Sequence, residues 1–229
     1  MRSAGSQHDS ITDRPIQDRK EHCMTSTTMQ LKASRRPSDV VRIEAEALLS
    51  LAERMDGTMA PAFSHAVDIV RTAVLEQRRI FVTGMGKSGI IAQKIAAILR
   101  SSWSPANFMH PGDAIHGEIG MLSPGSVVIA LSLSGETKEI LQLFHFFEDF
   151  GVKLISFTGN ATSSLAKASV VFLDCSVARE ACPFGLSPTS STAVMLALGD
   201  ALALEVSQSC GRTANDFENL HRKPGSPKL

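Results

Sequence analysis

The sequence predicts an α/β fold: a three-layer αβα sandwich around a central five-stranded parallel sheet. Short apolar runs of strand type alternate with helical segments through most of the chain, a pattern typical of parallel strands that are covered by helices on both faces. The last helical segment is apolar nearly all round, so it must be buried in the core or in a subunit interface.

Five runs form the predicted strands. In chain order they read RRIFVTG, PANFMH, SVVIALS, KLISFTG and SVVFLDC, of which PANFMH is the weakest. Each is short and apolar and is followed by turn residues, as expected for strands buried on both faces.

Helical spacing of apolar residues predicts the other elements. Two helices precede the first strand, one follows it through IIAQKIAAILR, another begins at Glu136, and the last runs from about Thr189 to Ser207. The apolar stripes of three of these helices are Ile43, Ala47 and Leu51; Phe63, Val67, Val70 and Val74; and Ile140, Phe144 and Phe147.

The chain is predicted to contain one domain with two polar ends. Residues 1–38 are polar and nearly free of large apolar side chains, which predicts a disordered N-terminal extension. Residues 39–221 form the domain, and residues 222–229 form a flexible tail. The N-terminus shows no secretory pattern and no apolar run approaches the ~20 residues needed to cross a bilayer, so we expect a cytoplasmic protein.

The balanced charge of the chain disfavours nucleic acid as a partner. It has 23 basic and 23 acidic residues, and therefore lacks the broad positive field on which sequence-independent nucleic-acid binding depends. Any bound anion must be held by local geometry, which indicates a small ligand. The four cysteines form no CxxC pair and no zinc-type spacing with histidine, so we expect reduced thiols.

A glycine-rich loop, Gly84–Gly89, follows the first predicted strand and reads GMGKSG. It matches the GxGxxG pattern of dinucleotide sites, but those also need an acidic residue about 20 positions further on, at the end of the next strand. That strand ends at His110, and Asp113 lies beyond a Pro-Gly turn. The Walker A pattern also fails, because Phe81 stands where its first glycine belongs.

A second loop, Ser132–Thr137, follows the third predicted strand and reads SLSGET. It places three hydroxyl groups around a glycine at the start of a helix, where unpaired N–H groups can bind a phosphate without net positive charge. The plainer interpretation is that Ser134 caps the helix, but capping accounts for one hydroxyl and not for three.

The motifs resemble those of the SIS (sugar isomerase) domain family, and of its arabinose-5-phosphate isomerase branch in particular. The resemblance is carried by GMGKSG, HPGDAIHGEIGML, SLSGETKEI and AREACPFGLSPTSSTAVMLALGDALA in that order, over about residues 78–221. It implies an SIS-type fold and interconversion of D-arabinose 5-phosphate and D-ribulose 5-phosphate through an enediol, in Kdo and lipopolysaccharide biosynthesis. Many relatives carry CBS domains after the SIS domain, whereas this sequence stops at Leu229.

The resemblance implies four catalytic residues: Glu180, Lys87, Glu139 and His221. Glu180 is the first candidate for the general base, although it could be an ordinary surface glutamate beside Arg179. Glu136 and Glu139 both lie where a carboxylate favours a helix start in any case. His221 is a candidate acid–base or ring-opening group and could act in a neighbouring subunit, but it is followed by RKPGSPKL in place of the family's Pro-Gly-Gly stretch.

The remaining candidates would bind the substrate or its phosphate. They are Gly86, Ser88, Ser132, Ser134, Gly135, Thr137, His110, His116, Ser191 and Thr192, although Thr189, Ser190 and Ser191 are equally good helix caps after Pro188. No metal site and no cofactor are predicted, because aldose–ketose isomerisation needs neither. Asp200, inside the apolar last helix, is expected to pair across an interface, since an unpaired buried charge is costly.

Two other functions stay open from sequence. SIS domains also act as sugar-phosphate sensors in regulators, although those usually carry a DNA-binding helix-turn-helix that the first forty residues do not offer. An isomerase of another sugar phosphate would have the same phosphate loop. The expected partners are a sugar phosphate and further copies of the chain, as a homotetramer or dimer, with no nucleic acid and no membrane.

Overall fold

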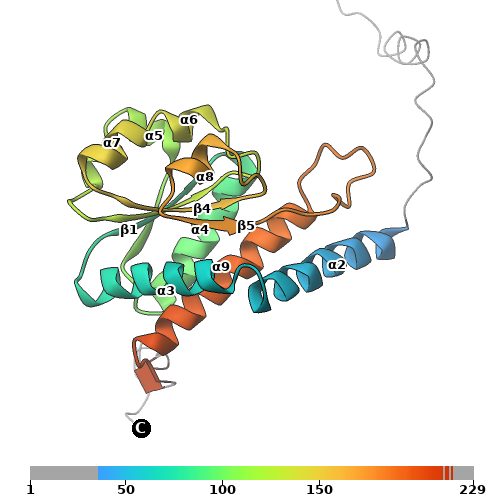
Figure 1. Ribbon diagram of the computed structural model, residues 1–229, viewed down its shortest axis with the longest axis horizontal. Coiled ribbons are helices and arrows are strands. Elements are labelled where there is room, and N and C mark those ends of the chain that lie inside the picture. Colours follow the sequence, from blue (N-terminus) through green and yellow to red (C-terminus); the bar gives the residue numbers. More distant parts are fainter. Residues whose placement is uncertain (1–35, 214, 217, 219–229) are drawn as a thin grey trace, which may run out of the picture. The chain divides into compact units, whose positions relative to one another are not determined.

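Five parallel strands form the central sheet in the order β2-β1-β3-β4-β5 (Figure 1). The computed structural model describes residues 36–213, 215–216 and 218. The strands are β1 (Ile80–Gly84), β2 (Ala106–Met109), β3 (Val127–Leu131), β4 (Lys153–Thr158) and β5 (Val171–Asp174). The predicted five-stranded parallel sheet is confirmed, including the weak strand β2.

Helices precede, connect and follow these strands. They are α2 (Pro37–Asp56), α3 (Ala60–Leu75), α4 (Gly86–Ser101), α5 (Pro111–Ile115), α6 (Lys138–Leu141), α7 (Phe144–Asp149), α8 (Ser164–Ala168) and α9 (Ser190–Ser209), with a 3-10 helix over Glu118–Met121. The apolar stripes predicted for the first two helices face inward: Ile43 and Leu51 of α2 are buried, as are Val67 and Val70 of α3.

The sheet separates two apolar cores, which makes the fold a three-layer αβα sandwich. Successive strand side chains point to opposite faces, and β1 illustrates this: Ile80 and Val82 belong to the larger core and Phe81 to the smaller one. The larger core packs α3, α4 and α9 against one face, and α5 to α8 cover the other face (Figure 1).

Helix α9 is the central element of the larger core. By length and hydropathy, α9 could cross a membrane, whereas no apolar run of that length was predicted from the sequence. Half of its most apolar stretch is buried, and it packs against α2, α3 and α4. These contacts account for its composition as a core helix. From the sequence, Asp200 was expected to pair across an interface. In the structure it is half-exposed and pairs instead with Lys94 of α4 in the same chain.

Three predicted boundaries differ from the structure. Helix α2 begins at Pro37, two residues before the predicted start of the domain. Helix α4 begins at Gly86, so the last four residues of the predicted glycine loop form its first turn. The single helix expected from Glu136 is divided into α6 and α7, because the amide of Leu143 bonds to the carbonyl of Ile140 and tightens the turn between them. Residues 1–35, His221 and the predicted tail lie outside the described residues.

Candidate functional site

The strand order reverses between β1 and β3, which are neighbours in the sheet although β2 lies between them in the chain. Ligands of such sheets bind outside the carboxyl ends of the strands at the reversal. The register pairs Gly84 with Leu131, the last residue of each strand, so the two predicted loops leave the sheet side by side.

The glycines after β1 allow α4 to begin directly on the strand end. A Cβ on Gly89 would lie 2.6 Å from the carbonyl oxygen of Gly84, and Gly86 has a φ of +55°, which favours glycine. The GxGxxG pattern therefore has a packing cause that involves no dinucleotide. Lys87 is exposed and Ser88 is half-buried, both in the first turn of α4.

The turn after β3 draws its hydroxyl groups together. The hydroxyls of Ser132 and Thr137 lie 2.7 Å apart, and that of Ser132 also accepts the amide of Gly135 at 3.1 Å. The Ser134 hydroxyl accepts the amide of Glu136 at 3.2 Å, so the capping interpretation holds for this serine. Thr137 is the N-cap residue of α6 but makes no side-chain capping bond to the first amides of this helix.

The loop after β4 supports this turn, and sequence reasoning missed it. The Thr158 hydroxyl donates to the carbonyl of Leu133 at 3.1 Å, and the carbonyl of Gly135 accepts the amide of Leu165 at 3.1 Å. Ser163 packs so closely against Gly135 that a Cβ on this glycine would lie 2.1 Å from the Ser163 hydroxyl oxygen. The signal that could have identified these residues is the strand KLISFTG, because parallel strands end at one common edge.

The two glutamates of the second motif have different surroundings. Glu136 accepts the amide of Ser164 at 2.7 Å, and this bond holds the pKa of the Glu136 carboxyl below its usual value. Glu136 therefore caps α8 and not the helix of its own motif. Glu139 is half-buried in the first turn of α6 and makes no hydrogen bond or ion pair with the described part of the chain.

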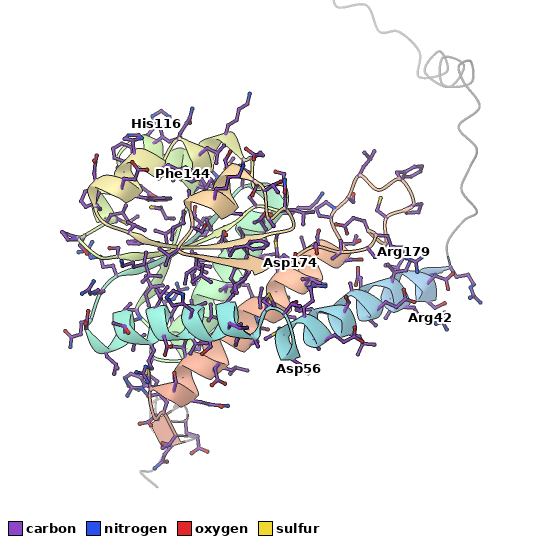
Figure 2. The ribbon with its side chains drawn as sticks, in the orientation of Figure 1. Arg42, Asp56, His116, Phe144, Asp174 and Arg179 are labelled. Carbon is purple, nitrogen blue, oxygen red and sulfur yellow. The ribbon has the colours of Figure 1, made fainter. Side chains whose placement is uncertain are left out.

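Glu180 is half-buried and bonded to the start of α9. Its Oε2 atom accepts the Thr189 amide at 2.7 Å, the Thr189 hydroxyl at 2.9 Å and the Ser191 amide at 3.4 Å. Burial raises the pKa of Glu180, but hydrogen bonds from Ser191 and Thr189 outweigh it, so that the pKa lies below its usual value. Arg179 turns away toward α2 and pairs with Glu46 at 3.0 Å (Figure 2). Glu180 is thus no ordinary surface glutamate.

The remaining candidates lie on different elements of the chain. His110 is the N-cap residue of α5, with its Nδ1 atom 3.7 Å from a carboxylate oxygen of Asp113. Figure 2 places His116 over the layer of α5 to α8, far from Arg179 and the segment that carries Glu180. The Thr192 hydroxyl donates to the carbonyl of Thr189.

Ser191 and Thr192 lie in the first turn of α9, where the amide of Ser191 donates to Glu180. Within the described ranges, no hydrogen bond links either of them to the turn Ser132–Thr137. Likewise, no group of three or more histidine, cysteine, aspartate and glutamate side chains that could hold a metal ion occurs among the described residues.

Comparison with known proteins places this fold and these motifs in one family. Residues 74–205, more than half of the chain, match the SIS domain. The chain belongs to the SIS domain family. This SIS protein is 52% identical over 143 residues to arabinose 5-phosphate isomerase KdsD of Pseudomonas aeruginosa, which covers 62% of the chain and 44% of that relative. It is 39% identical over 183 residues to the Francisella tularensis protein of the same name, covering 80% of the chain and 55% of that relative.

A solved structure supports the same assignment of the fold. The structure of an Escherichia coli CFT073 protein in complex with arabinose 5-phosphate matches this SIS chain with a TM-score of 0.71 and 34% identity, over 82% of this chain and 100% of that one. The chain spans about half the length of the curated relatives that it matches.

Proposed function

We propose that this SIS protein is an aldose–ketose isomerase that interconverts D-arabinose 5-phosphate and D-ribulose 5-phosphate. The observation that carries the proposal is the turn Ser132–Thr137, which gathers its hydroxyls at the strand reversal beside the first turn of α4. The KdsD relatives, and the Escherichia coli protein in complex with arabinose 5-phosphate, support this sugar phosphate as the substrate. The names of these relatives also support a place in Kdo and lipopolysaccharide biosynthesis.

The phosphate is assigned to the turn after β3 and the first turn of α4. Hydroxyls and helix amides bind a phosphate through directed hydrogen bonds, and Lys87 in the first turn of α4 adds a positive charge. Holding the distant phosphate orients the reacting carbons, so binding energy is used to position C1 and C2.

Glu180 is assigned as the general base. Because its pKa lies below the usual value, the carboxyl group is ionised at neutral pH and can accept a proton. The C2–H bond of the open-chain aldose breaks, the proton passes to the carboxylate, and the electron pair forms the C1=C2 bond of the enediol while the C1 oxygen gains a proton. Return of a proton to C1, with loss of the proton from the C2 hydroxyl, gives the ketose. We assign supporting roles to Lys87, Glu139 and His221, and expect turnover without added metal.

An oligomer, a homotetramer or dimer, is part of the proposal. Helix α2 exposes Val41 and Leu49, and α9 exposes Leu204, three apolar side chains that a second copy of the chain could cover. A second copy could also supply His116 or His221 to the segment that carries Glu180. Light scattering that found only monomers would contradict this part of the proposal. A cytoplasmic location follows from the proposed pathway.

The test is a panel of pentose and hexose phosphates, assayed with the chain and with the variants Glu180→Gln and Glu46→Gln. We expect interconversion of arabinose and ribulose 5-phosphates, and a fall in kcat of about 10²- to 10⁴-fold for Glu180→Gln, the usual contribution of a general base. Glu46→Gln is the matched control, because it removes an exposed glutamate whose ion pair among the described residues is with Arg179, next to Glu180 in the chain.

Each outcome of the panel has a definite meaning. Turnover of only a hexose phosphate would replace the proposed substrate, and binding without turnover of any sugar would favour a sensor. Unchanged turnover in Glu180→Gln would exclude Glu180 as the base and transfer that role to Glu139 or His221.

A further inference from the structure

Thr189 joins both ends of the segment between Glu180 and helix α9. Its hydroxyl donates to the Oε2 atom of Glu180 at 2.9 Å and accepts the amide of Ala181 at 2.8 Å, while its own amide donates to the same Oε2 atom at 2.7 Å. One threonine therefore fixes the Glu180 side chain and the backbone directly after it.

The residues between these two ends do not provide such support. Phe184 and Leu186 are 65% and 85% exposed, so residues 182–188 lie largely outside the core. Thr189, by contrast, is the N-cap residue of α9, and the first turn that follows it contains the buried residues Ser190 and Ser191. The Glu180 carboxylate is thereby held to a rigid core helix through Thr189.

We propose that Thr189 is a positioning residue for the base of this isomerase: its hydroxyl and its amide hold Oε2 of Glu180 and so fix the orientation of the carboxylate for proton transfer. The inference rests on the proposed function. Oε2 accepts three hydrogen bonds, two of them from Thr189, so the carboxylate cannot rotate without breaking them. A reacting group held in this way keeps the near-attack geometry on which the rate depends.

A simple capping role makes a different prediction. If Thr189 only capped α9, loss of its hydroxyl would lower stability but would leave the ionisation of Glu180 and the rate per folded molecule unchanged. If Thr189 positions Glu180, loss of its hydroxyl should change both the pKa of Glu180 and the rate per folded molecule. Hydrogen bonds of Ser191 and Thr189 lower the pKa of Glu180, and the nearest cation in sequence, Arg179, pairs with Glu46. Removal of one donor should therefore raise this pKa.

The experiment compares Thr189→Val, which removes the hydroxyl, with Thr189→Ser, which keeps it. Thr213→Val is the matched control, because the amide and hydroxyl of Thr213 both donate to the Oδ2 atom of Asp216, each at 2.8 Å, the same double contact outside the proposed site. The measurements are kcat and KM across pH on folded protein, and the pKa of the Glu180 carboxyl by ¹³C NMR titration, with Glu180→Gln to assign the signal.

For Thr189→Val we expect kcat to fall by about 10- to 100-fold with little change in KM, as for a slightly misplaced catalytic group. The acidic limb of its pH profile and the NMR titration should both move to higher pH, while Thr189→Ser and Thr213→Val should behave like the wild type. A Thr189→Val variant with wild-type rate and titration would overturn the inference. Wild-type protein without isomerase activity would refute the proposed function instead. In that case the NMR titration would still test whether Thr189 lowers the pKa of the Glu180 carboxyl. An equal Glu180 pKa in Thr189→Val and the wild type would overturn the inference.

Discussion

Replacing Gly135 with alanine should deform the turn that is proposed to bind the phosphate. Gly135 has a φ of +69°, and a Cβ there would lie 2.1 Å from the Oγ atom of Ser163 and 2.9 Å from the Oγ1 atom of Thr158. Ser163 cannot easily move away, since its hydroxyl donates to the carbonyl of Asn160 at 2.7 Å and accepts the amide of Ala166 at 3.2 Å as the N-cap of α8.

Two contributions set the size of the effect. A left-handed backbone costs an alanine about 1–2 kcal/mol relative to glycine, and a group forced into a packed site costs about 1–3 kcal/mol. Gly135→Ala should therefore lower the free energy of unfolding by about 2–5 kcal/mol, or the Tm by roughly 4–20 °C for a chain of this size. Gly151→Ala is the matched control, because Gly151 has a φ of +58° but nothing within 4 Å of its Cβ position. It should show only the backbone contribution, about 1–2 kcal/mol.

The assays are urea unfolding and the KM for the sugar phosphate that the substrate panel identifies. We expect Gly135→Ala to be less stable than Gly151→Ala by about 1–3 kcal/mol, and its KM to rise while that of the control stays at the wild-type value. Equal stabilities and equal KM values in the two variants would show that the contact between the turn and Ser163 does not shape the site.

Two further predictions concern ionisable side chains. The pKa of Glu180 is lowered in the folded chain, so its ionised form adds stability that is present above the unfolded pKa of about 4.3 and is lost as the pH falls through the folded pKa. Urea unfolding should therefore show Glu180→Gln to be less stable than the wild type at pH 7, with a difference in stability that shrinks as the pH falls below the unfolded pKa; a constant difference would refute this. Backbone amides of Ser187 and its neighbours lower the pKa of the Cys182 thiol to about 7, whereas burial raises that of Cys175. Peptide mass spectrometry should find Cys182 alkylated by iodoacetamide with a midpoint near pH 7 and Cys175 unmodified; equal labelling would contradict this.

The fold could be predicted from sequence because its signals are local. The runs around Ile80 and Val127 are short and apolar on both faces, and Ile43, Leu51, Val67 and Val70 repeat with the period of a helix. The same local rules identified the turns after β1 and β3. What they could not give was the start of α4 at Gly86, which depends on the close contact between Gly84 and Gly89.

The contacts that support the candidate site were beyond sequence reasoning because they join distant segments. Nothing near Gly135 indicates that Ser163, on another loop, fills the space where a side chain would stand. Similarly, Thr189 could be identified as a helix cap, but its bond to Glu180 depends on how residues 182–188 bring the two ends together. The partner of Asp200 was misjudged for the same reason, because Lys94 lies more than one hundred residues earlier in the chain.

The hydrogen bonds inside the turn after β3 reduce the number of donors that are left to bind a phosphate dianion there. The Gly135 amide is already bonded to Ser132, and the Glu136 amide to Ser134, so the turn uses two of its own donors to keep its shape. The donors left for a phosphate are the hydroxyls and the amides that begin α4 and α6, all of them uncharged. If the phosphate binds here as proposed, positive charge comes from the lysines in the first turns of these helices, Lys87 of α4 and Lys138 of α6, and binding should depend on them more than the hydroxyl count of the motif implies.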